Sequence, residues 1–216
     1  MRNILDFYYA GPDLAGRYRP DTLDGNDLLR LQQHPILSRQ TDWLVSRALK
    51  AAIRQQHTLS DGVLSHSNGC AVYLTCNVPN QIGVDLEQVK PRNFAAWHDI
   101  LHADEQHWLQ LHSNSPENYH VLWCLKEALI KAANGEWADL AAVGLRYRKR
   151  RWLLQAGGQT DWQGSVWLLD CFLLACVHKD AADYRFHGFG AWAEQLPQQY
   201  CTFSDGLVCF PNAAQP

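Results

Sequence analysis

The chain has 216 residues, of which 47% are hydrophobic and 19% charged, and its formal net charge is −3 with histidine neutral. This composition supports a sizeable hydrophobic core and excludes a globally disordered chain. Because the net charge is slightly negative, no overall basic field favours nucleic acid, and the length allows one large domain or two small ones.

Neither a targeting segment nor a membrane span is visible in the sequence. The first twenty residues contain acidic side chains and no apolar run of signal-peptide length, and no stretch reaches the roughly 18 apolar residues of a membrane span. The seven cysteines form no CxxC pair, and their apolar neighbours predict buried, reduced thiols. We therefore expect a monomeric cytoplasmic protein without membrane or nucleic-acid contacts.

In the first half of the chain, the pattern predicts a helix followed by short strands. Residues 1–37 contain three prolines, and we expect no long element there. Apolar residues at helical spacing predict a helix over 41–56. Three strands are expected over 63–87, with a turn at 68–69 and a second turn at 77–80.

The second half has the same order, with helices before strands. The Trp- and His-rich stretch 94–111 predicts one or two helices. Ser115 and Pro116 supply an N-cap and a first helical residue, so we expect a helix from there to about Ala133, ended by Asn134-Gly135. Three segments then predict strands: 143–155, 165–170 and 172–179.

These elements predict an α+β fold, as two layers packed side by side. The tail from Leu196 on contains three prolines, and we expect it to be irregular. No sequence repeat is detectable, so any internal duplication would be structural only.

The segment GVDLE (83–87) predicts a strand with two carboxylates on one face. Side chains alternate along a strand, so Val84 and Leu86 point one way while Asp85 and Glu87 point the other. Two such charges are costly to bury unpaired, and a hard cation such as Mg²⁺ would neutralise them. A solvated strand face explains the same pattern without a metal.

Two further segments carry polar groups at regular spacing. On the helix WCLKEALIK (123–131), positions four apart stack, so Trp123, Glu127 and Lys131 share a face. An ordinary exposed Glu–Lys pair has the same spacing. The segment LSHSNG (64–69) ends a strand before a tight turn, and no GxSxG elbow there supports an acyl-serine mechanism.

Taken in order, SHSxG, GVDLE and WxxKEALxK resemble the phosphopantetheinyl transferase superfamily, and in particular its longer, pseudo-dimeric branch. Glu105 in LHADEQHWL resembles an acidic helix residue of that family, and FLLACVHK is similar to its apolar C-terminal strand. The resemblance spans about residues 40–180. It implies two similar α+β halves, 1–105 and 106–216, related by a pseudo-two-fold, with coenzyme A (CoA) in the cleft between them.

The resemblance also implies an activity, the transfer of the 4′-phosphopantetheine arm of CoA to a serine of an apo acyl or peptidyl carrier protein. The serine hydroxyl attacks phosphorus and 3′,5′-ADP leaves. Asp85, Glu87 and Glu127 would hold Mg²⁺ against the CoA pyrophosphate, and Glu127 or Glu87 would take the serine proton.

By the same resemblance, basic and polar side chains would bind CoA. Lys131 would contact the pyrophosphate with Lys126 nearby, and Ser65 and His66 match positions that contact CoA phosphates. Relatives often carry a Gly-Lys-Pro turn before SHSxG that helps to hold the nucleotide, and RQQHTLSDGVLSHS (54–67) has no such turn.

Three basic residues are the expected substitutes for this turn: Arg47, Lys50 and, more weakly, Arg39. The missing turn leaves an alternative open, a non-catalytic relative that binds CoA or a carrier protein. An unrelated protein with a coincidental acidic strand is a second alternative.

The basic run 146–151 predicts an exposed hairpin, solvated or serving as a docking patch for an acidic carrier protein. Alternation along a strand would place Arg146, Arg148 and Arg150 on one face. Contact with nucleic acid is a poor alternative, because no aromatic stacking platform accompanies the run.

Overall fold

The computed structural model describes residues 2–56, 61–78, 81–91, 94–97, 99–204 and 206–210. The α-helices are α1 (Gly25–Gln33), α2 (Thr41–Gln56), α3 (Ala103–Leu111) and α4 (Pro116–Ala133). The strands are β1 (Asn3–Ala10), β2 (Gly62–Ser67), β3 (Cys70–Cys76), β4 (Ile82–Gln88), β5 (Gly144–Arg148), β6 (Arg151–Ala156), β7 (Gln159–Leu169), β8 (Phe172–His178), β9 (Ala182–Phe189), β10 (Gln198–Ser204) and β11 (Leu207–Cys209). Short 3-10 helices include η3 (Pro35–Arg39), η4 (Phe94–Trp97) and η5 (Trp137–Asp139).

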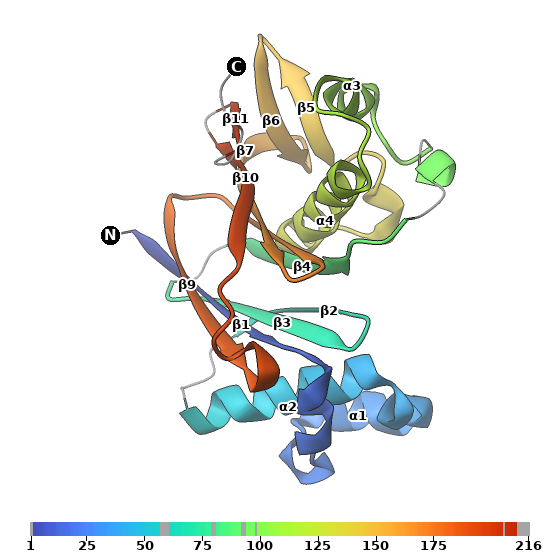
Figure 1. Ribbon diagram of the computed structural model, residues 1–216, viewed down its shortest axis with the longest axis vertical. Helices are drawn as coiled ribbons and strands as arrows, with labels where there is room; N and C mark the ends of the chain where they lie inside the picture. Colours follow the sequence, from blue (N-terminus) through green and yellow to red (C-terminus); the bar gives the residue numbers. More distant parts are fainter. Residues whose placement is uncertain are drawn as a thin grey trace.

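Two sheets form the centre of the molecule (Figure 1). The first sheet has the order β2-β3-β1-β9, in which β1 and β9 run parallel and the other neighbours antiparallel. The second sheet has the order β11-β10-β7-β6-β5, and β8 pairs with both β7 and β4. Both sheets therefore combine strands from before and after residue 105, through β9 in the first and β4 in the second. This confirms the α+β class, whereas the pseudo-two-fold stays a prediction.

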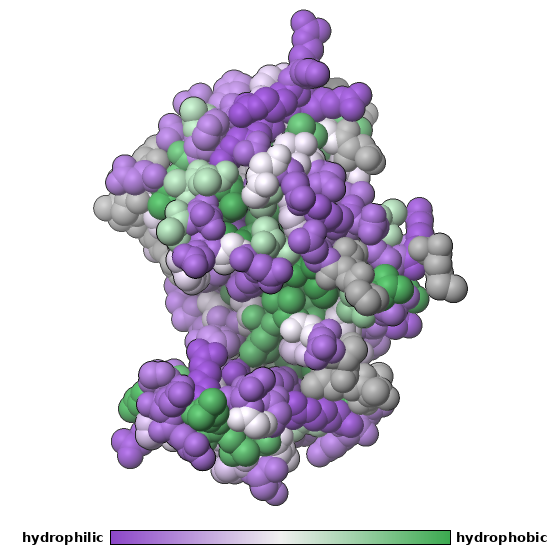
Figure 2. Space-filling model, turned by 180° about the vertical axis from the view of Figure 1, so that it is seen from behind, coloured by the Kyte–Doolittle hydropathy of each residue, from purple (hydrophilic) through white to green (hydrophobic). Residues whose placement is uncertain are grey.

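The layers follow the order helix, sheet, sheet, helix. In β1, Phe7 and Tyr9 pack in the core between the sheets, while Tyr8 packs in the core that includes residues of α2. In β8, Leu174 faces the core between the sheets and Ala175 faces the core that includes α4. Seen from behind, apolar side chains gather where the molecule narrows between its lower and upper parts (Figure 2).

The predicted boundaries of α2 and α4 are confirmed, and local chemistry explains them. The Ser115 hydroxyl accepts a hydrogen bond from the Asn118 amide at 3.3 Å, and Pro116 is the first residue of α4. Asn134 ends the helix with a left-handed backbone at φ 52°. The hairpin turn at Asn68-Gly69 is confirmed as well, whereas the predicted turn over 77–80 lies partly outside the described residues.

Both ends of the chain are more ordered than predicted. Residues 1–37 contain β1, which ends before the first proline, and α1, which Asp24 caps between the second and third prolines. The tail from Leu196 is not irregular: β10 and β11 lie there, because β10 gains backbone hydrogen bonds from β7 despite the preceding Pro197. Tertiary pairing thus overrides a weak local pattern at both ends.

The cysteines divide into three groups, which are buried, partly exposed (Cys76) and exposed. Four are buried (Cys70, Cys124, Cys176, Cys201), and all seven are free thiols. Cys171 and Cys209 are exposed, contrary to the prediction that these thiols are buried. In the described part of the chain, no helix combines the length and apolar character that a membrane crossing requires.

Candidate functional site

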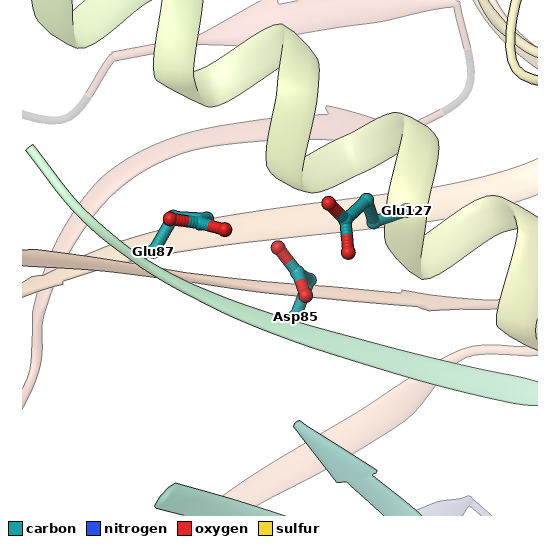
Figure 3. A group of neighbouring side chains, drawn as sticks. All are labelled: Asp85, Glu87 and Glu127. Atoms are coloured by element: carbon teal, nitrogen blue, oxygen red, sulfur yellow. The ribbon is translucent and has the colours of Figure 1, made fainter. Parts of the chain in front are cut away.

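Three carboxylates converge between β4 and α4. Asp85 and Glu87 extend from β4, and Glu127 extends toward them from α4 (Figure 3). One oxygen of each carboxylate lies within 4.8 Å of the others. Asp85 and Glu127 are buried, and Glu87 is partly exposed. The solvated strand face considered from the sequence is therefore wrong.

Alternation and a close approach of backbones build this arrangement. Ile82, Val84 and Leu86 point into the core between the sheets, which turns Asp85 and Glu87 toward α4. At Gly83 a Cβ atom would lie 1.9 Å from the Ala128 carbonyl oxygen of α4. The missing side chain therefore lets α4 lie directly on β4, so that Glu127 reaches the two strand carboxylates.

The electrostatics of the cluster fit a divalent cation. Asp85 Oδ2 is buried and has no hydrogen-bond partner among the described residues. Burial and the nearby Asp85 carboxylate raise the pKa of Glu127 to about 8, which shows how unfavourable three carboxylates are at this spacing. A hard cation with oxygen ligands would satisfy the unpaired oxygen and neutralise the repulsion. The donor set therefore fits Mg²⁺.

The Lys131 amine is the cation of this site. Its Nζ donates to Asp85 Oδ1 at 2.8 Å, to Ser65 Oγ at 3.0 Å and to the Val84 carbonyl oxygen at 3.0 Å. It lies 3.9 Å from Glu127 Oε2, one helical turn away. The predicted shared face of Glu127 and Lys131 thus points into the cluster, and the pair is more than an exposed surface contact.

Two residues of the SHSNG motif reach the site to different extents. The Ser65 hydroxyl is buried and donates to Asp85 Oδ1 at 2.7 Å. His66 points away, because side chains alternate along β2. Its Nδ1 lies 3.7 Å from Asp42 Oδ2, and partial desolvation lowers the pKa of its imidazole.

The structure does not bring Arg47 and Lys50 to the carboxylates. The Arg47 guanidinium is buried against Asp27, with Nη2 2.8 Å from Oδ1, and Lys50 Nζ lies 2.7 Å from Asp24 and 2.6 Å from Asp27. Both cations thus attach α1 to α2. Arg39 is exposed at the end of η3.

Lys126 also lies away from the cluster, contrary to its predicted place near the pyrophosphate. Lys126 lies three residues after Trp123 and directly before Glu127 on α4. Consecutive residues of a helix are rotated by about 100°, so the Lys126 side chain points away from the cluster that Glu127 faces. Its amine is fully buried against Glu105 of α3. Glu105 is also buried away from the cluster, and burial raises the pKa of its carboxyl.

Sequence reasoning missed a hydrogen-bonded chain that ends on Glu87. The Ser67 hydroxyl donates to Glu87 Oε2 at 3.1 Å, Asn68 donates to Ser67, and Lys90 Nζ donates to Asn68 Oδ1 at 2.7 Å. The sequence did contain a signal for this contact. Residues two apart share a face of a strand, so Ser65 and Ser67 lie on one face of β2, as Asp85 and Glu87 do on β4.

The basic run forms the predicted hairpin, but its residues do not share one face. Arg146 is buried, and its guanidinium donates to the carbonyl oxygen of Ala142 at 2.7 Å. Lys149 and Arg150 form a two-residue turn with φ angles of 50° and 65°, which ends the strand alternation after Arg148. The exposed positive charge is therefore at the tip.

Comparison with known proteins agrees with the position of the site. Residues 81–181 match the family model of the 4′-phosphopantetheinyl transferase superfamily. This range contains all three carboxylates and Lys131, whereas Ser65 and His66 precede it. A search of curated proteins found no match to the chain.

Proposed function

We propose that this chain, whose residues 81–181 match the family model of the 4′-phosphopantetheinyl transferase superfamily, is a member of that superfamily and transfers the phosphopantetheine arm of CoA to a serine of an apo acyl or peptidyl carrier protein. The products are holo carrier protein and 3′,5′-ADP. The observation that carries the proposal is the cluster of Asp85, Glu87 and Glu127 beside the Lys131 amine, within the matched range.

Asp85, Glu87 and Glu127 are the residues that would hold Mg²⁺. When bound there, the cation supplies positive charge that stabilises the reacting pyrophosphate. The unpaired Asp85 Oδ2 and the raised pKa of Glu127 support this assignment, because both describe carboxylates whose charge Lys131 offsets only in part. Ser65 and Ser67 donate to Asp85 and Glu87 and so orient these carboxylates.

Lys131 supplies the protein's own positive charge to the leaving group. Its side chain is about a quarter exposed, at 26%, so the amine can exchange a present partner for a pyrophosphate oxygen. The Ser65 hydroxyl accepts a hydrogen bond from the same amine, so it lies next to the position that a pyrophosphate bound by Lys131 would take. His66, exposed beside Asp42, is the candidate contact for a further phosphate of CoA.

The chemical step joins the serine oxygen of the carrier to phosphorus and breaks the bond from phosphorus to the oxygen of 3′,5′-ADP. The serine proton has to leave as this bond forms. Glu127 or Glu87 accepts it, directly or through water. Both carboxylates lie in the cluster beside the Lys131 amine.

A second candidate function is binding of CoA or of a carrier protein without turnover. The missing Gly-Lys-Pro turn favours it, since Arg47 and Lys50 are held by Asp27 and Asp24 and do not replace that turn. The longer pseudo-dimeric branch, the halves 1–105 and 106–216, the cytoplasmic location and the monomeric state stay predictions.

One experiment separates the two functions. The protein is incubated with CoA, Mg²⁺ and a panel of apo carrier proteins from fatty-acid, polyketide and peptide synthesis, and each carrier is weighed by mass spectrometry. A carrier that gains the mass of the arm only when Mg²⁺ is present supports the transferase. Binding of CoA by calorimetry without any gain of mass would support the non-catalytic function.

A further inference from the structure

A buried ion cluster lies on another side of α4 from the three carboxylates. Lys126 and Glu105 have no exposed side-chain surface, and Lys126 Nζ lies 2.8 Å from Glu105 Oε2. The same amine donates to the carbonyl oxygens of Leu140 at 2.9 Å and Val143 at 2.7 Å. An ammonium group has three N–H donors, so each of them has an acceptor here.

Both carboxylate oxygens of Glu105 also have hydrogen-bond donors. Its Oε1 accepts the Leu145 amide at 3.0 Å, and its Oε2 accepts the His102 amide at 2.8 Å. The buried Arg146 guanidinium lies 3.9 Å from Oε1. The group of Glu105, Lys126 and Arg146, which we name the Glu105 latch, therefore connects α3, α4 and β5.

The backbone closes over this latch at Gly144. This residue has φ of +121°, and a Cβ atom would lie 2.0 Å from Glu105 Oε1 and 3.1 Å from Lys126 Nζ. Glycine is therefore required for the chain to approach the charged pair so closely. The backbone at the start of β5 thus packs directly against the Glu105–Lys126 pair.

Stability alone gives little reason to bury these charges. A buried ion pair is on average no more stabilising than apolar side chains of similar volume, but its hydrogen bonds have direction. Many other buried contacts of α4, such as those of Leu125 and Leu129, are apolar and tolerate rotation. On the neighbouring face, Lys131 holds α4 to Asp85 of β4 while the Glu127 and Asp85 carboxylates repel each other, so the charges there do not by themselves fix the rotation of α4.

We infer that the Glu105 latch is a positioning device, which fixes α4 in the rotation that holds Glu127 and Lys131 against Asp85 in spite of the repulsion between carboxylates. The inference rests on the proposed function, because the cation site that it positions is the one used there. Lys126 and Glu105 are positioning residues, because their charged groups bond to α3, β5 and the loop before β5. Supporting groups of this kind typically change metal affinity about 10- to 100-fold.

The test measures Mg²⁺ binding by calorimetry in the absence of CoA and carrier protein. Lys126→Met removes the charge and keeps an unbranched side chain, and Glu105→Gln keeps the shape and one acceptor oxygen. We expect each folded variant to bind Mg²⁺ about tenfold or more weakly. At saturating Mg²⁺, kcat should fall while KM for CoA changes little.

Leu109→Ala is the matched control. Leu109 is buried in α3 in the same core, so this variant loses thermal stability without touching the latch. It should keep the Mg²⁺ affinity of the wild-type protein at temperatures where it is folded. Wild-type affinity and kcat in folded Glu105→Gln would overturn the inference, whatever Lys126→Met does.

The outcomes also separate this inference from the proposed function. Wild-type protein that binds Mg²⁺ but modifies no carrier contradicts the transferase function, and the latch is still judged by the affinities of its variants. Wild-type protein that binds and transfers, with unchanged variants, contradicts the latch alone. Wild-type protein that binds no Mg²⁺ contradicts both.

Discussion

Lys131 Nζ lies 2.8 Å from Asp85 Oδ1, so a helix and a strand are joined by one charged contact at the candidate site. In the cation-free protein, this amine offsets part of the charge of the three carboxylates. A bound cation would take over that function and release the amine toward an anionic substrate. If the proposed function holds, this contact predicts that binding of the cation and binding of CoA are coupled.

The carboxylates are expected to dominate the activity. Asp85→Ala and Glu127→Ala should each lower kcat by at least about a hundredfold, because a lost metal ligand or proton acceptor costs several kcal/mol of barrier. Steady-state rates with saturating Mg²⁺ and CoA measure this effect. Glu117→Gln, on the first turn of α4, serves as the control and should keep its activity. Near-wild-type kcat in either alanine variant contradicts the metal assignment.

Substitution of Lys131 should mainly lower activity, whereas substitution of Lys126 should mainly lower thermal stability. Lys131→Met should lower kcat/KM for CoA by about tenfold or more, because one charge-assisted contact to a phosphate is lost. Lys126→Met should lose more thermal stability than Lys131→Met, because it leaves the fully buried Glu105 without its cation. Melting curves and CoA kinetics on both proteins check the comparison. Equal losses in both measurements contradict it.

The raised pKa of Glu127 predicts a pH dependence of stability. Its folded pKa of about 8 lies above the ordinary value of 4.5, so between these values the folded protein binds more protons than the unfolded chain. The free energy of unfolding should therefore decrease as pH rises from about 5 to about 8, by at most about 1.4 kcal/mol per pH unit. Denaturant titrations without metal measure the slope. Glu127→Gln should flatten it.

Bound Mg²⁺ should oppose this loss of stability at higher pH, because the cation binds the deprotonated form of the Glu127 carboxyl. The affinity of the protein for Mg²⁺ should rise as pH increases toward about 8 and level off above that value. Calorimetry in buffers of different ionisation enthalpy counts the protons released. An affinity that does not change between pH 6 and pH 8 would contradict the assignment of Glu127 as a ligand.

The tip of the β5–β6 hairpin is the test of carrier docking. Changing both Lys149 and Arg150 to Glu should raise KM for an acidic carrier protein and leave KM for CoA unchanged. The wild-type rate should also fall with salt, since exposed charges are screened over about 10 Å at 0.1 M. Arg17→Glu, on an exposed residue of the first part of the chain, is the control. An unchanged carrier KM and salt slope would leave the hairpin as a solvated turn.

Local patterns were sufficient to predict what a single element determines. The capped α4, the hairpin of β2 and β3 and the shared face of Asp85 and Glu87 all follow from caps, turn residues and alternation, and the structure confirms them. Contacts between distant elements could not be predicted in this way. Lys126 is the clearest case, because only tertiary packing shows that its neighbour is Glu105 and not a substrate phosphate.

The same limit explains the misplaced basic residues. Arg47 and Lys50 have the right charge for a nucleotide, but α1 supplies Asp24 and Asp27 as partners, and the proline-rich pattern of residues 1–37 did not predict that helix. Conversely, Gly83 looked like an ordinary strand residue. Its importance depends on the Ala128 carbonyl of α4, which the sequence does not place there.

The parallel pairing of β1 with β9 has a consequence for biosynthesis. Asn3 pairs with Ala182 and Ala10 with Phe189, so the first sheet is incomplete until the ribosome has added and released residues near 190. Before then, β1 exposes one edge and much of its apolar face. We expect the nascent chain to delay its final collapse and to depend on chaperones until late in translation, because long-range strand pairing is slow and an unpaired edge promotes aggregation.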